Sequence, residues 1–423
     1  MPAGGSEQVP AVLSVGRRSV VRAALGALAA VAAAGRAARL AAGAAVDPRL
    51  FEPMRRLGAP VSPYGSRSPF ETAVRYLAPT TTPFSSASMT PLDQTYGIIT
   101  PSSLHFERHH AGVPTIHPAH YRLLIHGMVE RPRMYSLADL KRFPSVSAIY
   151  FIECSGNSQS GWRIAEPNRT VQMNHGLTSC SEWTGVPLAT LLKEVGVKPG
   201  ARWLLAEGMD GAAYTRSIPI EKAWQDVLVA YGQNGEALRP EQGYPVRLVV
   251  PGWEGSIMVK WLRRIELSDR PFMTREETAR YTDLMPDGTA RMFTWVMDAK
   301  SVITWPSGGH QIPEPGFWEI TGLAWSGKGR IVRVEVSTDG GRSWALAELQ
   351  QPVLPLAHTR FRFPWRWDGE EALLQSRATD ETGYVQPTRA ALLSRRGTNS
   401  LYHYNGIQTW RVSPDGRVTH ENV

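Results

Sequence analysis

Cysteine is scarce in this chain, and its scarcity excludes two kinds of metal protein. The 423 residues include two cysteines, Cys154 and Cys180, and neither belongs to a CxxC or CxxCH pattern. A zinc site built from several cysteines and a covalently attached c-type haem are therefore excluded. A long apolar run is also missing near the N-terminus, where the stretch 23–34 is shorter than the ~20 residues that a membrane span requires.

Concentrated charge is likewise missing. The formal net charge is +8, but residues 1–45 carry five arginines and one glutamate, a net of +4, which leaves +4 for the rest. No basic stripe interleaved with aromatic residues follows, so a nucleic-acid-binding protein is not expected. Glycine and proline are plentiful, at 38 and 32 residues, which favours a loop-rich protein with much β-structure.

The first 45 residues have the pattern of a bacterial twin-arginine export signal. Arg17 and Arg18 precede the apolar run, and small residues follow at 41–45. The alternative is a membrane anchor, which the short run and its interruption by glycine and arginine disfavour. The pattern therefore predicts a periplasmic protein. Because this route exports folded proteins, we expect any cofactor to be loaded in the cytoplasm.

The chain behind the signal predicts an α+β protein in two parts. Strands alternate with a few helices up to about residue 285, and short strands at sandwich-like spacing follow. We therefore expect a mixed α/β domain followed by an all-β, immunoglobulin-like sandwich. The expected boundaries are 1–45 for the export signal, 46–104 for an extended arm, 105–285 for the catalytic domain, 286–395 for a dimerisation domain and 396–423 for a C-terminal tail.

The stretch from Phe151 to Trp162 is the strongest local signal. An apolar run over 146–152 predicts a buried strand, and Cys154 stands where that run gives way to a turn rich in serine, glycine and asparagine. A strand end can hold one thiol rigidly at the mouth of a loop. The alternatives are an inert buried thiol and a disulfide with Cys180, for which no other role is apparent.

A second polar segment, residues 103–114, contains three histidines and Arg108 without helical or strand periodicity. One interpretation is a solvated loop. The other is an anion cradle, because the arginine fork and imidazole donors suit phosphate and related oxyanions.

Five segments in order resemble the sulfite oxidase family of molybdenum enzymes, from about residue 100 to 395. They are Phe106-x-Arg108-x-His110 with Val113-Pro114, Cys154-x-Gly156-Asn157, Glu207-Gly208-x-Asp210 through Ser217-Ile218-Pro219, Gly243-Tyr244-Pro245-x-Arg247, and Gly255-x-x-x-Val259-Lys260-Trp261-Leu262. Within the family, the chain is most similar to the branch that oxidises sulfane sulfur during thiosulfate oxidation.

The resemblance implies a molybdenum–molybdopterin cofactor, with Cys154 as the thiolate ligand of the metal. It places Tyr281 and Arg108 beside Cys154 as catalytic residues. The residues implied in cofactor binding are Phe106, Arg108, His109, His110, Cys154, Asp210, Gln242, Arg247, Ser256 and Lys260. Two of these depart from the family, which has asparagine at the His109 position and histidine at the Gln242 position.

Two further departures concern the substrate. Sulfite-oxidising members have arginines where this chain has Gln159 and Ile257, and an oxyanion in a desolvated pocket needs charged donors. The resemblance therefore implies oxidation of sulfane sulfur bound to a carrier protein. Arg360 and Arg362 could replace the missing charge, although surface arginines on a strand are the simpler interpretation. Trp162 and Trp183 are expected to be packing residues.

The expected partners follow from the same resemblance. No haem domain is expected in this chain, so electrons would pass to a separate c-type cytochrome, in a homodimer or a heterotetramer with that cytochrome. One alternative is a periplasmic sulfite dehydrogenase acting on free sulfite. A third hypothesis is a metal-free binding or scaffold subunit.

Overall fold

The computed structural model describes residues 48–80, 82–292 and 294–422, so the predicted export signal lies outside the described residues. Residues 48–71 belong to a unit of their own, in which Pro48–Arg55 forms a 3-10 helix. The unit from Thr72 to Val423 contains the strands and helices described below. Among the described residues, no helix has the length and apolar character needed to cross a membrane.

The first half of this larger unit is built on two five-stranded sheets and one small sheet. The small sheet has the order β1 (Tyr76–Leu77), β2 (Ala87–Met89), β3 (Glu107–Arg108). The second sheet has the order β11 (Glu236–Ala237), β10 (Leu228–Gln233), β7 (Thr178–Pro187), β6 (Val146–Glu153), with β12 (Arg247–Val249) also paired to β10. The third has the order β5 (Arg133–Tyr135), β4 (Leu123–Gly127), β13 (Leu262–Ser268), β8 (Trp203–Gly208), β9 (Thr215–Pro219).

Only short helices accompany these sheets. They are α2 (Leu137–Leu140), α3 (Val171–His175), α4 (Leu188–Val195), α5 (Ile220–Gln225) and α6 (Arg275–Thr278). Ser136 caps α2, because its hydroxyl accepts from the Asp139 amide and the Asp139 carboxylate accepts from the Ser136 amide. The sheet of β4 and β13 is mixed, since these two strands are parallel while the other pairs in it are antiparallel.

The second half is formed by two antiparallel sheets with one helix. One sheet has the order β16 (Lys300–Trp305), β17 (Gly316–Trp325), β21 (Thr359–Trp367), β20 (Glu348–Leu349). The other has the order β19 (Ala345–Leu346), β18 (Ile331–Ser337), β22 (Ala372–Asp380), β23 (Thr409–Val412), β24 (Val418–Glu421). The hairpin β14 (Asp283–Leu284) and β15 (Ala290–Arg291) precedes them, and α7 (Arg389–Arg396) lies between β22 and β23. Residues 396–423, expected to be a tail, thus contribute two strands.

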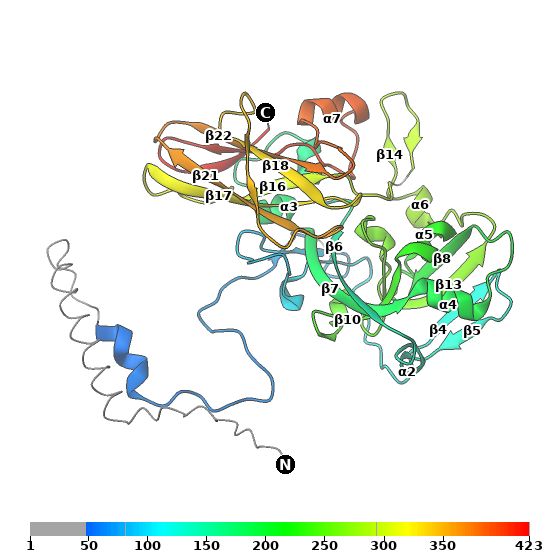
Figure 1. Cartoon of the computed structure of the whole chain (residues 1–423). Coiled ribbons are helices and arrows are strands. Elements are labelled where there is room, and N and C mark those ends of the chain that lie inside the picture. The colour runs from blue at the N-terminus through cyan, green and yellow to red at the C-terminus, as the bar shows by residue number, and fades with distance from the viewer. Residues whose placement is uncertain (1–47, 81, 293, 423) are drawn as a thin grey trace, which may run out of the picture. The chain divides into compact units, whose positions relative to one another are not determined.

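The two halves are joined through β6 and β7. Figure 1 shows the yellow to red strands β16, β17, β18, β21 and β22 grouped apart from β4, β5, β8 and β13, with β6 and β7 between the groups. Phe151 on β6 and Cys180 on β7 belong to the same hydrophobic core as Trp325 and Phe361 of the C-terminal sheets. The predicted order, a mixed domain with few helices followed by a β-sheet domain, is confirmed, and β6 sits at their junction.

Candidate active site

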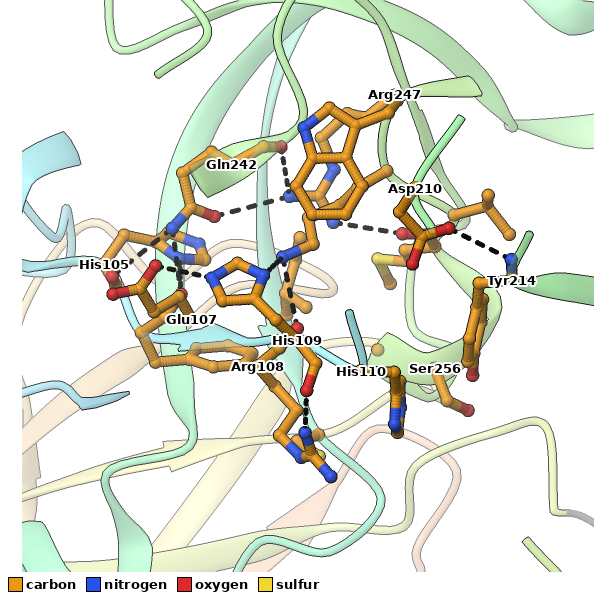
Figure 2. A pocket seen from close by; sticks show the side chains of 18 of the residues that line it. His105, Glu107, Arg108, His109, His110, Asp210, Tyr214, Gln242, Arg247 and Ser256 are labelled. Atoms are coloured by element: carbon orange, nitrogen blue, oxygen red, sulfur yellow. Dashed lines mark hydrogen bonds and ion pairs between the residues drawn. The ribbon is translucent and has the colours of Figure 1, made fainter. Parts of the chain in front are cut away.

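One pocket collects every residue that the sequence analysis placed at a cofactor (Figure 2). It encloses about 680 Å³, its open mouth included. The predicted residues that line it are Phe106, Arg108, His109, His110, Cys154, Asp210, Gln242, Arg247, Ser256, Lys260 and Tyr281. They come from six separated stretches of chain, so the fold brings together side chains that are up to 175 positions apart, from Phe106 to Tyr281.

The loop that carries Cys154 is held by hydrogen bonds on both sides. The Cys154 amide donates to the carbonyl of Leu177, and the Asn157 amide donates to the Cys154 carbonyl, each at 2.9 Å. The Asn157 side chain donates to Glu153 at 2.9 Å and accepts from the Leu177 amide at 3.1 Å. A Cβ added at Gly156 would meet only the Cys154 sulfur, at 4.0 Å, so the space beside the sulfur is open.

Both cysteines are free, and their settings differ. Cys180 is fully buried in β7, opposite Phe151, and burial raises the pKa of its thiol to about 12. Cys154 lines the pocket, and burial also raises the pKa of its thiol, although the charge of Arg108 acts in the opposite direction. A bound metal cation would deprotonate the Cys154 thiol, because a coordinated sulfur is a thiolate.

Two cations, Lys260 and Arg247, lie at the other end of the pocket, while the charge of Arg108 acts on Cys154 and His110. Lys260 donates to the carbonyls of Arg108 at 3.2 Å and Glu241 at 2.9 Å, and Arg247 donates to those of Gln242 and Met258. Burial lowers the pKa of Arg247 to about 9, and burial together with the Arg247 charge lowers that of Lys260 to about 7. Within the described residues, no carboxylate lies within 4 Å of the charged nitrogens of Lys260, Arg247 or Arg108. This end of the pocket would therefore stabilise an anion.

Two histidines complete the wall on that side. His109 contacts Lys260 Nζ through Nδ1 at 2.9 Å and Glu107 through Nε2 at 2.6 Å, so Nδ1 accepts from the ammonium and Nε2 donates to the carboxylate. Burial lowers the pKa of His109. Burial and the charge of Arg108 lower the pKa of His110 to about 4. Both rings are therefore neutral at pH 7, and the predicted anion cradle relies on Arg108, Lys260 and Arg247 for charge.

Tyr281 lies at the Cys154 end of the pocket. Its hydroxyl is 3.3 Å from His110 Nε2, and burial raises its pKa well above the usual value of 10. The guanidinium carbon of Arg216 lies 5.0 Å from the centre of the Tyr281 ring. Tyr281 also has a left-handed backbone, with φ 55°. A non-glycine residue in that region costs about 1–3 kcal/mol, which the surrounding packing must sustain.

The structure places four residues at this end that the sequence analysis missed. Tyr214 lines the pocket, and behind it the buried Arg216 forms an ion pair with Glu254 at 2.7 Å. Burial alone would raise the pKa of Glu254, but the Arg216 charge and a hydrogen bond from His403 lower it. His403, in the C-terminal half, donates its amide to the Ser155 carbonyl. A charged residue inside β9 was a usable signal for Arg216, whereas nothing local to His403 indicates this contact.

The residues singled out for substrate charge do not line the pocket. Gln159 begins a 3-10 helix (Gln159–Trp162) and lines a second groove, while Ile257 is fully buried in the core. Arg360 donates to the carbonyls of Thr95 and Gly97, and Arg362 pairs with Glu348. Both arginines thus lie on β21, are half-buried and make structural contacts, and neither lines the pocket.

The two tryptophans are buried, as expected of packing residues. Trp162 packs edge-on against Tyr404, with ring centres 5.2 Å apart. Trp183 lies beneath Arg247, whose guanidinium carbon is 4.9 Å from the ring centre. Trp183 thus also supports one of the three cations of the pocket.

Comparison with known proteins identifies two domains in the chain. Residues 110–276 match a family described as the oxidoreductase molybdopterin binding domain. Residues 291–410 match the Mo-co oxidoreductase dimerisation domain. The boundary between the two matches falls at the hairpin of β14 and β15.

Individual relatives are similar over most of this chain. Sulfite oxidase of Gallus gallus is 34% identical over 322 residues, which are 69% of each chain. The NADH nitrate reductase of Solanum lycopersicum is 33% identical, but the match spans 37% of that protein. Among solved structures, the sulfane dehydrogenase SoxCD from Paracoccus pantotrophus is 49% identical with a TM-score of 0.87, covering 90% of this chain and all of that one.

The pocket fits the group that these matches imply. Molybdopterin carries a phosphate and two thiolate sulfurs, all anionic. The pocket offers the buried Arg247 and the half-buried Arg108 and Lys260, none with a carboxylate within 4 Å among the described residues, together with one thiol beside open space. His105 adds a fully buried ring whose Nε2 has no partner within the described residues. A buried polar atom of this kind is ordinarily satisfied by a bound group.

Proposed function

Because the chain belongs to the sulfite oxidase family of molybdenum enzymes, and is a molybdopterin-dependent oxidoreductase, we propose that it oxidises sulfane sulfur bound to a carrier protein. The observation that carries the proposal is the position of Gln159 and Ile257, which leaves the Cys154 end of the pocket without the two arginines of sulfite-oxidising members. The 49% identity to a sulfane dehydrogenase supports the same substrate.

The residues have distinct roles in this proposal. Cys154 binds the molybdenum, while Arg108, Arg247 and Lys260 hold the anionic pterin and its phosphate by charge-assisted hydrogen bonds. Asp210 accepts from pterin N–H groups, and Phe106, His109, Gln242 and Ser256 complete the wall. When bound, the cofactor supplies two-electron oxidation coupled to transfer of a water-derived oxygen atom to sulfur.

We propose that Tyr281 and His110 form hydrogen bonds to the reactants at the Cys154 end of the pocket, which we call the reacting end. The Tyr281 hydroxyl stays protonated because burial raises its pKa, so it can donate to an oxygen atom of the product. His110 is neutral and lies 3.3 Å from that hydroxyl, so it can orient the donated hydrogen bond. Arg108 adds positive charge beside both.

The localisation, the electron acceptor and the oligomeric state of the enzyme are also part of the proposal. The twin-arginine pattern in residues 1–45 supports export to the periplasm with the cofactor already bound. We propose that this chain contains no haem and passes its electrons to a c-type cytochrome. The dimerisation-domain match supports a dimer made through an immunoglobulin-like sandwich of the C-terminal sheets, either alone or in a heterotetramer with the cytochrome.

A periplasmic sulfite dehydrogenase is the second candidate. The similarity to sulfite oxidase and the presence of Arg108 in the pocket favour it. The scaffold hypothesis is set aside, because the chain is a member of an enzyme family and retains a complete pocket.

Turnover by purified protein of known molybdenum content distinguishes the two candidates. The acceptor is a c-type cytochrome, and the substrates compared are free sulfite and a sulfur-carrier protein loaded with thiosulfate. We expect turnover with the loaded carrier and little with sulfite. Rapid oxidation of free sulfite, with none of the carrier-bound sulfur, would assign a sulfite dehydrogenase instead.

A further inference from the structure

Arg216 is a buried cation placed directly behind the reacting end of the pocket. It belongs to β9 and is fully shielded from solvent. One guanidinium nitrogen donates to the Ser256 hydroxyl at 2.5 Å, and the guanidinium lies against the Tyr281 ring. Ser256 and Tyr281 line the pocket together with Cys154. Arg216 thus touches the inner side of two wall residues without entering the pocket itself.

Two carboxylates compensate the charge of Arg216. Glu254 lies 2.7 Å and Glu277 3.7 Å from its guanidinium nitrogens, and all three side chains are fully buried. Arg108, whose charge acts on Cys154 and His110, has no carboxylate within 4 Å of its charged nitrogens among the described residues. The Cys154 end of the pocket therefore has two cations of different kinds, Arg108 without a close carboxylate and Arg216 with two.

Contacts other than those with Arg216 hold the carboxylates of Glu254 and Glu277 in position. Glu277 accepts from the amide and the hydroxyl of Ser217, and also from the Thr274 amide in the capping box of α6. Glu254 is fixed through its backbone, since its amide donates to the Trp295 carbonyl, and its second oxygen lies 2.8 Å from His403 Nε2. Neither carboxylate can turn away from Arg216 without breaking these contacts, so the compensation is a built feature of the fold.

We propose that Arg216 is a specificity-determining positioning residue, which holds Tyr281 and Ser256 in place while Glu254 and Glu277 cancel its charge. Arg108 then remains as the cation without a close carboxylate at the reacting end, which favours sulfur attached to a carrier, with at most one negative charge, over free sulfite, which bears up to two. This inference rests on the proposed function, because it explains how the same pocket binds an anionic cofactor and discriminates against a doubly charged substrate.

The test measures binding of inorganic sulfate, which is not a substrate for oxidation, to the molybdenum-loaded enzyme by isothermal titration calorimetry. Glu254→Gln removes one compensating charge while it keeps the side-chain volume. We expect sulfate to bind at least about tenfold more tightly to this variant than to the wild type, since a buried uncompensated charge acts strongly over a few ångströms. In Arg216→Met/Glu254→Gln, the gain should disappear because the cation is gone.

Three further variants separate charge from structure. Glu254→Asp disturbs the ion pair but keeps its charge, so sulfate affinity should stay at the wild-type level. Glu277→Gln removes the other carboxylate and should tighten sulfate binding as well, which keeps the test open if Glu254→Gln fails to load molybdenum. Glu335→Gln removes a carboxylate that pairs with Arg377 in the C-terminal sheets, and it should change nothing in the pocket.

The inference is overturned if the wild type binds sulfate as tightly as Glu254→Gln and Glu277→Gln, or if the gain persists without Arg216. Neither result depends on turnover. Failure of the proposed function would show separately, as sulfite oxidation by the wild-type enzyme with no activity on carrier-bound sulfur.

Discussion

The ammonium of Lys300 lies 2.5 Å from a carboxylate oxygen of Glu153, the residue immediately before Cys154. Lys300 begins β16 in the C-terminal half of the protein, and Glu153 ends β6 in the catalytic half. Trp325, on β17, donates its indole N–H to the other carboxylate oxygen at 2.7 Å. The C-terminal domain therefore holds the base of the loop that presents the thiol.

Replacing Lys300 with methionine should destabilise the whole protein. Glu153 would remain fully buried without its cation, and breaking a buried ion pair in this way costs about 3–5 kcal/mol. Urea unfolding followed by circular dichroism measures the loss. The Lys300→Met/Glu153→Gln variant should recover part of it, because no uncompensated charge remains. Equal stability of Lys300→Met and the wild type would show that the pair contributes nothing to this junction.

Serine at position 154 should abolish retention of molybdenum. A hydroxyl is a much poorer ligand than a thiolate for this metal, so we expect metal content to fall by at least about tenfold. Cys180→Ser is the matched control, since Cys180 is buried in β7 away from the pocket. Elemental analysis of both purified variants provides the measurement. Full molybdenum in Cys154→Ser would disprove the ligand assignment, whereas full molybdenum in Cys180→Ser is expected.

Removing the charge of Lys260 should loosen the cofactor without unfolding the protein. One charge-assisted hydrogen bond is worth about 1.5–3 kcal/mol, so Lys260→Met should raise the dissociation constant of the cofactor roughly 10- to 100-fold. Fluorescence of the oxidised pterin released on dilution measures this. Lys328→Met, which removes a surface ion pair with Asp298, should retain the cofactor normally. Equal release from the two variants would mean that Lys260 does not contact the cofactor.

The buried His358 predicts a loss of stability in mild acid. Its ring packs between Phe151 and Trp325 at the junction of the two halves, and burial lowers its pKa from 6.5 to about 3. Below pH 6.5, His358 therefore binds a proton in the unfolded chain but stays neutral in the folded protein. The neutral His358 ring therefore does not lower the free energy of unfolding above pH 6.5. Between pH 6.5 and 3 this free energy falls with falling pH, by ~1.4 kcal/mol per pH unit.

Urea unfolding at pH 7.5, 6.0 and 5.0 measures this dependence. His358→Gln keeps a partner for the Thr178 hydroxyl, which lies 3.0 Å from His358 Nε2 in the wild type, and it cannot titrate. We expect a shallower decline of stability with falling pH in this variant, although other buried histidines such as His175 preserve part of the slope. Identical slopes in the two proteins would contradict the prediction.

Strand β6, the turn after it and the helix cap of α2 could be predicted from the sequence, because each depends on residues close together in the chain. The apolar run 146–152 corresponds to β6, which extends by one residue to Glu153, and the serine- and glycine-rich turn places Cys154 at its end. Ser136 caps α2 because its short polar side chain competes for the free amides at a helix start. The five segments that resemble the sulfite oxidase family also supply residues to one pocket, since members of a family share a fold.

The contacts that cross the chain were beyond reach of the sequence. Glu153 and Lys300 are 147 positions apart, and Ser155 and His403 are 248 apart, so no periodicity or spacing connects them. The compensation of Arg216 by Glu254 and Glu277 likewise depends on how β9 packs against the 3-10 helix Gly255–Ile257, which follows Glu254, and against α6. A charged residue inside a strand signals that a partner exists, but only the tertiary fold identifies it.

The ion pair of Lys300 with Glu153 also has a consequence for the order in which the protein folds and binds its cofactor. The thiol loop acquires its final support from residues that a ribosome makes about 150 positions later, so a nascent or truncated catalytic half has Cys154 but not its anchored base. We therefore expect cofactor insertion to act on a nearly complete polypeptide. If so, two domains that look separable in sequence mature together, and cutting the chain between β15 and β16 should yield a fragment that cannot keep its metal.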